Sequence, residues 1–559
     1  MHAVLGGPPT PVARVTMLTE GTYPHSPGGV SVWCDQLVQG MPDVDFRVLA
    51  VTGTGQEQPV WPLPAQVSGV ETVALWGAEP AGRAPRGRDA RELLAAWEGL
   101  LLALLAEEPG EDGDGEDGDR GGGTTEAAPA AGEGAGSGGG TRDERAEFGT
   151  QLYTLAEWAD SGALFAALRT EEAVRVLARL WRRPGTTVAA AAPTHHDALT
   201  ATDLLEHLLR PLGAAPAPAP GGVSHAVSGG LAALPGLVAH QRHGTPLLLT
   251  EHGVYQRERY LGYRTGPYRW PVKALLLGFF RLLSRETYRT SALITPGNRY
   301  NRRWEEHGGA APDRIRTVYN GVDPGAFPPA GPEPLTPTLT WAGRIDPIKD
   351  LETLIRAFAL VREEIPAARL RIFGGTPRGG EAYRERCEAL AGALGAGEAV
   401  TFEGRVDDIR TAYAAGQVVM LSSISEGFPF TLIEAMSCGR CTVSTDVGGV
   451  REAVGDTGLV VPPRDPAAMA RAALELLRDP GRRAALGEAA RLRVIERFTL
   501  RRTIDAFREI YRELGAAPRR PERVGGGPAR MPRAWQPARS AGAAPQAARD
   551  GLCAAKDGR

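Results

Sequence analysis

Residues 422–439 have the sequence SSISEGFPFTLIEAMSCG, and the organisation of the chain is best understood from them. The apolar run VVML at 418–421 precedes this stretch and predicts a buried strand. A run of helix formers follows and stops at Gly439. Pro429 falls in the first turn of that helix, where its missing N–H group has no partner to lose. The pattern predicts strand, loop and helix, and the free N–H groups of a helix N-terminus suit a phosphate.

Two carboxylates bracket this turn. Glu426 lies in the predicted loop and Glu434 in the predicted helix, with seven residues between them. Carboxylates accept hydrogen bonds from sugar hydroxyls. Taken alone, such a pair also fits two ordinary surface glutamates. Placed on either side of an anion-binding helix terminus, the pair indicates a site for a nucleotide sugar.

The arrangement E-G-F-P-F-x-x-x-E resembles the signature of the retaining glycosyltransferases of family 4. This resemblance implies the α/β GT-B fold, in which two Rossmann-like doubly wound domains face a cleft. It also implies that Glu426 contacts the donor sugar and that Glu434 holds the ribose hydroxyls. The intervening residues would meet the sugar and the distal phosphate, and they are Gly427, Phe428, Pro429, Phe430, Thr431 and Leu432.

Composition limits the classes of protein. The 559 residues leave room for more than two domains, and 42% hydrophobic and 23% charged residues are typical of a globular protein with a packed core. The net charge of −3 argues against a nucleic-acid partner. Five scattered Cys do not form a disulfide framework, and neither a secretory signal nor an apolar run long enough to span a membrane is apparent. We therefore expect a cytoplasmic enzyme.

The N-terminal region predicts the first unit of a doubly wound fold. A strand at 14–18 is followed by Gly28 and Gly29 and then by a helix at 31–38, and ligands bind at such strand ends. The glycine pair alone fits either a plain turn or a close approach of the backbone to an anion. The family resemblance implies that this turn touches the donor pyrophosphate. The string LTEGTYPHSPGGVSVW at 18–33 resembles the PelF subgroup of this family, which serves Pel exopolysaccharide systems.

His252 directly follows an expected strand at 246–250, so its side chain is expected at the ligand-binding edge of the sheet. A single histidine is often structural, but the family resemblance implies that this one lies against the donor sugar. The string T-E-H-G-V-Y-x-R-E-R at 250–259 again resembles the PelF subgroup. His225 is a second candidate, on the acceptor side. His195, His196 and Asp197 lack a third ligand at metal-site spacing and indicate the start of a helix.

Two cationic residues lie just before the start of the first helix that is expected in the C-terminal domain. Arg344 and Lys349 precede an expected helix at 351–364 and can both contact phosphate oxygens. In the related family a basic pair at this place neutralises the leaving diphosphate. The family also recognises the base through the turn that contains Arg405 and Val406. Cys438 and Cys441 form one C-x-x-C pair, which we interpret as buried small residues.

The expected organisation follows from these motifs and from two biased segments. Residues 107–145 are rich in Gly, Ala and acidic residues and predict a disordered insertion, where the pairs Asp112/Asp114 and Asp117/Asp119 are not expected to bind metal. The expected parts are an N-terminal Rossmann-like acceptor-side domain at 13–327, a proline-rich linker at 328–337, a C-terminal Rossmann-like nucleotide-sugar-binding domain at 338–498, a helix that crosses back at 499–515 and a disordered tail at 516–559.

The resemblance implies a retaining hexosyltransferase that needs no metal and no cofactor beyond its UDP-sugar co-substrate. Similarity to the PelF subgroup implies transfer of glucose from UDP-glucose to a saccharide acceptor in exopolysaccharide synthesis. Membrane-bound synthase subunits as partners and a peripheral place at the inner face of the membrane fit this function. Two alternatives stay open, namely a non-catalytic nucleotide-sugar-binding scaffold subunit and a GT-B epimerase or phosphorylase.

Overall fold

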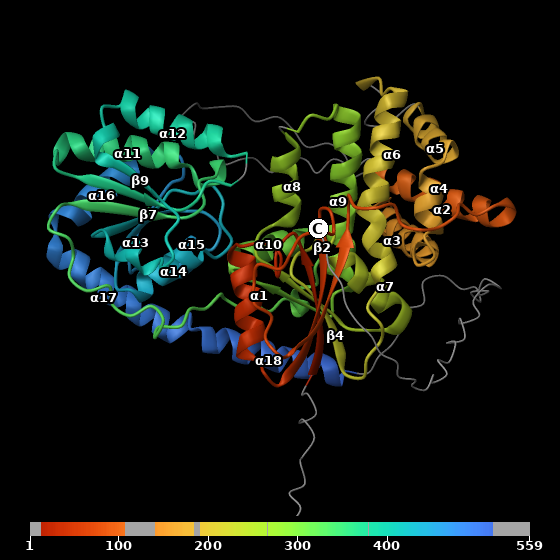
Figure 1. The fold of residues 1–559 in the computed structure, drawn as a ribbon, viewed down its shortest axis with the longest axis horizontal. Helices are drawn as coiled ribbons and strands as arrows, with labels where there is room; N and C mark the ends of the chain where they lie inside the picture. The colour runs from red at the N-terminus through yellow and green to blue at the C-terminus, as the bar shows by residue number, and fades with distance from the viewer. Residues whose placement is uncertain (1–12, 107–139, 184–190, 265, 378, 518–559) are drawn as a thin grey trace, which may run out of the picture. The chain divides into compact units, whose positions relative to one another are not determined.

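Two parallel sheets carry the fold (Figure 1). The computed structural model describes residues 13–106, 140–183, 191–264, 266–377 and 379–517. The described strands form one sheet of order β3-β2-β1-β4-β5-β6 and a second of order β12-β11-β10-β7-β8-β9. In each sheet the chain reverses its direction of winding once, between β1 and β4 and between β7 and β10. Ligands bind beside the carboxyl ends of strands at such switch points.

The first sheet forms because short apolar strands alternate with amphipathic helices, which is the pattern of parallel α/β folds. Its strands are β1 (Ala13–Glu20), β2 (Val44–Thr52), β3 (Val67–Ala74), β4 (Gly222–Ala226), β5 (Leu247–Glu251) and β6 (Leu293–Pro296). The helices that follow individual strands are α1 (Gly29–Gly40), α7 (Ala233–His243), α8 (Tyr255–Arg264), α9 (Trp270–Thr290) and α10 (Arg299–His307). Both β4 and β5 are buried along their whole length.

A helical subregion interrupts the alternation between β3 and β4. It contains α2 (Gly87–Leu105), α3 (Gly140–Ala159), α4 (Ala163–Leu168), α5 (Glu171–Trp181) and α6 (His195–Leu209). Its large buried side chains, Trp97, Phe148 and Trp181, join the core on one side of the first sheet. Two helices were expected between 147 and 183, but Gly162, in a left-handed conformation, separates α4 from α3 and makes three.

The expected disordered insertion extends too far at its C-terminal end. Helix α3 begins at Gly140, so residues 140–145 are helical. Their sequence, GTRDER, contains helix formers that the preceding glycine-rich run concealed. Residues 107–139 and 518–559 lie outside the described residues, and with them the Asp112 to Asp119 pairs and most of the expected tail.

The second sheet places β10 next to β7 at its centre. Its strands are β7 (Thr338–Ala342), β8 (Arg369–Phe373), β9 (Val400–Gly404), β10 (Val418–Leu421), β11 (Cys441–Thr445) and β12 (Leu459–Val461). Its helices are α11 (Leu351–Glu364), α12 (Glu381–Ala393), α13 (Arg410–Ala414), α14 (Phe430–Ser437), α15 (Val450–Val454), α16 (Pro466–Arg478) and α17 (Pro480–Arg497). Trp341, Phe358 and Met420 belong to its buried core.

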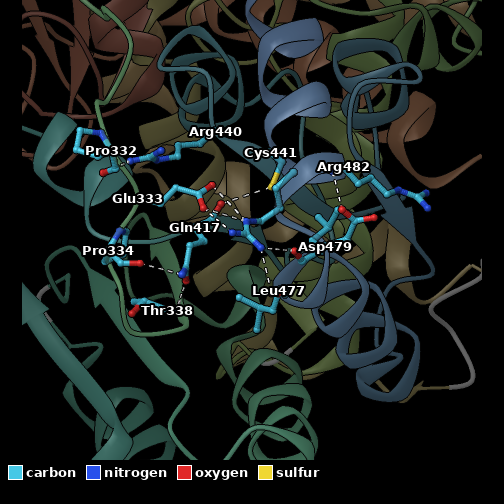
Figure 2. Close-up of polar contacts among 12 residues, drawn as sticks. Pro332, Glu333, Pro334, Thr338, Gln417, Arg440, Cys441, Leu477, Asp479 and Arg482 are labelled. Carbon is cyan, nitrogen blue, oxygen red and sulfur yellow. Dashed lines mark hydrogen bonds and ion pairs between the residues drawn. The ribbon is translucent and has the colours of Figure 1, made fainter.

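The proline-rich segment 328–337 is fixed to the second sheet and its helices. Glu333, labelled in Figure 2, pairs with Arg483 of α17, whose Nη2 lies 2.5 Å from Glu333 Oε2. The side chain of Gln417 donates to the carbonyl of Pro334 at 2.9 Å and accepts from the amide of Thr338 at 2.5 Å. This part of the chain is therefore an ordered strap.

The last described helix, α18 (Leu500–Ala516), returns to the first sheet. It packs against α1, β1 and β4, and Phe507, Ile510 and Tyr511 of α18 belong to the buried core there (Figure 1). The expected domain boundaries remain predictions, because residues 1–522 form one compact unit by their contacts. Of the helices in the described ranges, none combines the length and apolarity that crossing a bilayer requires.

Candidate functional site

The loop between β10 and α14 ends in an uncapped helix N-terminus. Pro429 is the N-cap residue of α14, and no side chain accepts a hydrogen bond from the first turn. The first N–H groups of an α-helix have no partner within the helix. The amides at Phe430 and Thr431 are therefore available to an anion, as the sequence predicts.

Lys349 and Glu426 meet at this loop. The Nζ atom of Lys349 lies 2.5 Å from Glu426 Oε1, and the Ser423 hydroxyl donates to the same oxygen at 2.6 Å. The Glu426 side chain is only 10% exposed, so water screens this ion pair weakly. Glu426 Oε2 makes no hydrogen bond to any described residue, so one carboxylate oxygen is held while the other can accept a ligand hydroxyl.

Lys349 and Glu426 are 77 residues apart in sequence, and they meet because both follow strands at the switch point of the second sheet. Lys349 belongs to a 3-10 turn (Pro347–Lys349) after β7, and the Glu426 loop follows the neighbouring β10. Two hydrogen bonds join them, from Ser422 Oγ to the Lys349 carbonyl at 2.7 Å and from the Ile424 amide to the Ile348 carbonyl at 2.9 Å. Arg344, by contrast, is 64% exposed, with Asp346 4.0 Å away.

His252 is brought to the same loop from the first sheet. A Cβ atom built on Gly427 would lie 1.6 Å from the carbonyl oxygen of His252, so only glycine permits this backbone contact. The His252 ring packs edge-on against Trp33, with ring centroids 4.6 Å apart. Burial lowers the pKa of His252 to about 4, so the ring is neutral at neutral pH. Its Nε2 atom is buried and has no partner among the described residues.

The glycine pair near the N-terminus also reaches this region. Helix α1 begins at Gly29, after Gly28, without a side-chain cap. A Cβ atom on Gly29 would lie 3.7 Å from Cδ2 of Phe430. The N-termini of α1 and α14 therefore lie near each other, and predicted residues from both halves of the sequence surround one place.

Glu434 is held by a residue that the sequence analysis does not single out. The Tyr413 hydroxyl donates to Glu434 Oε2 at 2.5 Å. Burial raises the pKa of Glu434, and the hydrogen bond from Tyr413 partly offsets that effect.

A second glycine pair supports the loop from behind. A Cβ atom on Gly448 would lie 1.8 Å from the Glu426 carbonyl oxygen, and the Gly449 amide donates to the Gly427 carbonyl at 2.8 Å. The sequence VGGVRE at 447–452 by itself predicts only a turn into a helix. Two small residues at the end of β11, a strand adjacent to β10, are the signal that could have indicated this contact.

The remaining candidates separate into different roles. Arg405 is exposed, and among the described residues no contact joins it to Glu426. Val406 packs on the hydrophobic cluster that contains Val419 and Ala435. His225 is wrong as an acceptor-side candidate. It is fully buried, and its two ring nitrogens lie 2.7 Å from the hydroxyls of Tyr511 and Thr250, because β4 is an interior strand.

The histidines at 195 and 196 start α6, as predicted. The side chains of Thr194 and Asp197 form a capping box there. Cys438 and Cys441 are buried free thiols. No group of three or more His, Cys, Asp or Glu side chains suited to a metal ion occurs within the ranges that the structure describes. Metal independence nevertheless remains a prediction.

The two sheets, with the Lys349–Glu426 pair at a switch point, define the class as proteins of the GT-B glycosyltransferase fold. Sucrose-phosphate synthase from Thermosynechococcus elongatus shares this fold, with a TM-score of 0.55 and 18% identity over 90% of this chain and 99% of that one. HepE of Anabaena, solved with UDP and glucose, aligns with a TM-score of 0.50 and 15% identity over 89% and 98%.

Sequence comparisons give the family. Residues 13–313 match the model described as "Domain of unknown function (DUF3492)", and residues 336–479 match "Glycosyl transferases group 1". The chain belongs to the DUF3492 family, and residues 336–479 are similar to the group 1 glycosyltransferases. A D-inositol 3-phosphate glycosyltransferase of Streptomyces bingchenggensis is 34% identical over 227 residues, which are 37% of this chain and 49% of that protein. The chain thus spans about half the length of the curated relatives that it matches first.

Proposed function

We propose that this protein is a retaining glycosyltransferase that moves glucose from UDP-glucose to a saccharide hydroxyl in exopolysaccharide synthesis. The observation that carries the proposal is the fixed Glu426 carboxylate beside the uncapped start of α14. Lys349 and Ser423 hold one oxygen of Glu426, and the other oxygen is left for a sugar hydroxyl. Few other ligands need a hydroxyl acceptor and an anion site side by side.

Charge stabilisation is the main contribution of the site to catalysis. As the glycosidic C–O bond breaks, negative charge gathers on the departing diphosphate. Arg344, Lys349 and the amides near Thr431 stabilise that charge. Lys349 and the amides are held in place before the reaction, which keeps their reorganisation energy low, and the exposed Arg344 adds a second cation. The cationic sugar centre forms beside Glu426 and the neutral ring of His252. The acceptor hydroxyl attacks on the face that the leaving group vacates, and its proton passes to a diphosphate oxygen.

Two observations support the finer parts of the proposal. The strings at 18–33 and 250–259 resemble the PelF subgroup, which favours UDP-glucose and an exopolysaccharide product. The HepE protein of the same fold was solved with UDP and glucose. On this proposal the enzyme acts in the cytoplasm, uses no metal, and works with membrane-bound synthase subunits at the inner face of the membrane.

The test is the turnover of UDP-glucose by the wild type and by Glu426→Ala, with Glu475→Ala on the exposed face of α16 as the matched control. We expect Glu426→Ala to lower kcat by a factor on the order of 100 to 1,000, as for other preorganised polar groups, and the control to retain full activity. Unaltered turnover in Glu426→Ala contradicts the proposal.

The same assay separates the two alternatives. UDP binding without turnover of any sugar nucleotide favours a scaffold subunit. Release of an altered sugar nucleotide, or a requirement for phosphate, favours an epimerase or a phosphorylase.

A further inference from the structure

Tyr413 and Glu434 form a buried polar contact whose purpose the proposed reaction leaves unexplained. Tyr413 of α13 is completely buried, and its hydroxyl donates a hydrogen bond to Glu434 Oε2 at 2.5 Å. The other oxygen, Oε1, makes no hydrogen bond to a described residue, and it is not among the fully buried atoms that lack a partner. Glu434 therefore presents one oxygen to the protein and one oxygen outward.

Tyr413 itself is fixed from behind. The Nε atom of Arg440 donates to the carbonyl of Tyr413 at 3.1 Å, and Arg440 Nη2 lies 3.4 Å from the Pro332 carbonyl of the strap. Figure 2 shows Arg440 reaching toward Pro332 beside the Glu333 contacts. The buried guanidinium of Arg440 therefore fixes the backbone at Tyr413, which keeps the phenol hydroxyl next to Glu434.

We propose that Tyr413 is a positioning residue that orients Glu434 toward the 2′- and 3′-hydroxyls of a ribose, and so makes the site selective for ribonucleoside over 2′-deoxyribonucleoside diphosphates. This inference rests on the proposed function, the use of a UDP-sugar, and on the family resemblance, which implies that Glu434 holds the ribose hydroxyls. An ionised carboxylate with one anchored oxygen can accept hydrogen bonds from neighbouring hydroxyls along fixed directions. Without the phenol the same carboxylate can rotate, and it becomes easier to protonate because it loses a donor to its charged form.

Calorimetric titration with UDP and with 2′-deoxy-UDP tests the inference on the full chain. We expect the wild type to bind UDP about tenfold more tightly, which corresponds to one hydrogen bond to a charged group. Tyr413→Phe should remove most of that ratio, because it weakens UDP binding more than the binding of 2′-deoxy-UDP, which offers Glu434 only the 3′-hydroxyl. Tyr383→Phe is the matched control, because it also removes a buried phenol hydroxyl from this half of the chain. That hydroxyl accepts a hydrogen bond from the Leu351 amide.

Measuring both affinities across a pH series distinguishes orientation of Glu434 by Tyr413 from a purely structural role of Tyr413. The preference of the wild type for UDP should fall as pH falls and Glu434 becomes protonated, and Tyr413→Phe should show this loss at higher pH. If the variant does not fold, a wild-type preference for UDP that stays constant as pH falls still overturns the inference.

Other outcomes overturn the inference in distinguishable ways. Equal weakening of both nucleotides in Tyr413→Phe makes the tyrosine structural only. Tight but equal binding of both nucleotides by the wild type overturns the inference and leaves the proposed function standing. Failure of the wild type to bind UDP overturns both.

Discussion

At the scale of single residues, the site depends on how two carboxylates are held. Lys349 and Ser423 both donate hydrogen bonds to one oxygen of Glu426. Tyr413 donates a hydrogen bond to one oxygen of Glu434. A carboxylate with one oxygen anchored has lost rotational freedom before any ligand arrives, which reduces the entropy cost of binding. The residue types at 426, 434 and 349 were identifiable from the sequence. Ser423 and Tyr413 were not, because a serine or tyrosine near a motif has no distinguishing pattern until its partner is known.

Ser423→Ala removes the neutral donor to Glu426 and leaves the ion pair with Lys349. We expect kcat/KM for UDP-glucose to fall about tenfold, since one hydrogen bond to a charged group is lost. Steady-state kinetics measure this. Ser444→Ala is the control, because the buried Ser444 hydroxyl on β11 has no partner among the residues that the structure describes, and its removal should leave activity unchanged. Equal activities of Ser423→Ala and the wild type would exclude the positioning role.

At the scale of elements, three loops at strand ends meet through backbone atoms. The loop after β10 contacts the loop after β5 at Gly427, and it rests on the loop after β11 at Gly448 and Gly449. Each contact is too close for a side chain. The arrangement therefore places His252, Glu426 and the start of α14 together through glycine, at positions that the sequence marks only as turns.

Gly427→Ala forces the two loops apart, because its Cβ atom would overlap the His252 carbonyl. We expect at least a 100-fold loss of kcat/KM, since small displacements of reacting groups cost that much. Kinetics and circular dichroism together separate lost activity from lost folding. Gly392→Ala on α12, where a Cβ atom meets nothing within 4 Å, is the matched control and should be fully active. Full activity of Gly427→Ala would show that the contact is not needed.

Two buried carboxyl groups influence each other electrostatically, Glu251 at the end of β5 and Glu305 in α10. Glu305 is fully buried and neither of its oxygens has a partner among the described residues, while Glu251 accepts from the Tyr288 hydroxyl at 2.7 Å. Burial, and next the charge of Glu251, raise the pKa of Glu305. The folded protein thus binds a proton more tightly than the unfolded chain does.

Because the folded-state pKa of Glu305 is raised, its contribution to stability is complete below the unfolded pKa near 4.3 and is lost as pH rises through the folded value. Glu305→Gln cannot titrate. We expect the stability of the variant relative to the wild type to increase by roughly 1–3 kcal/mol between pH 5 and pH 9. Urea unfolding across this range measures it. A difference that stays constant with pH would refute the assignment.

At the scale of the whole molecule, the two sheets are joined by polar contacts as well as by chain connections. Glu452 of α15 accepts from the amides of Arg299 and Tyr300 at the start of α10, each at 2.9 Å, and from the Tyr319 hydroxyl at 3.0 Å. The Asn320 side chain donates to the Phe428 carbonyl at 2.9 Å. Helix α18 adds apolar contacts on the first sheet. These contacts hold the site, because its residues come from both sheets.

Glu452→Ala removes the acceptor of three hydrogen bonds, two of them from a helix N-terminus. We expect the free energy of unfolding to fall by about 2–4 kcal/mol, because hydrogen bonds to charged groups are lost and two amides are left unpaired. Chemical denaturation measures the change. Glu475→Ala, which breaks an exposed pair with Arg482 on α16, should cost under about 1 kcal/mol. Equal costs for the two variants would mean that Glu452 is not a structural link.

The sequence by itself determined the alternation of short apolar strands with amphipathic helices, and hence the doubly wound fold, because periodicity and glycine turns act locally. It also determined the residue types at 344, 349, 426 and 434. The folded chain was needed to show that Ser423, Tyr413 and Gly448 complete the site, that Glu452 links the two sheets, and that His225 is buried in the core. The physical reason is that strand order in a parallel sheet brings together loops far apart in sequence, and a side chain acquires its role from the partner it meets there.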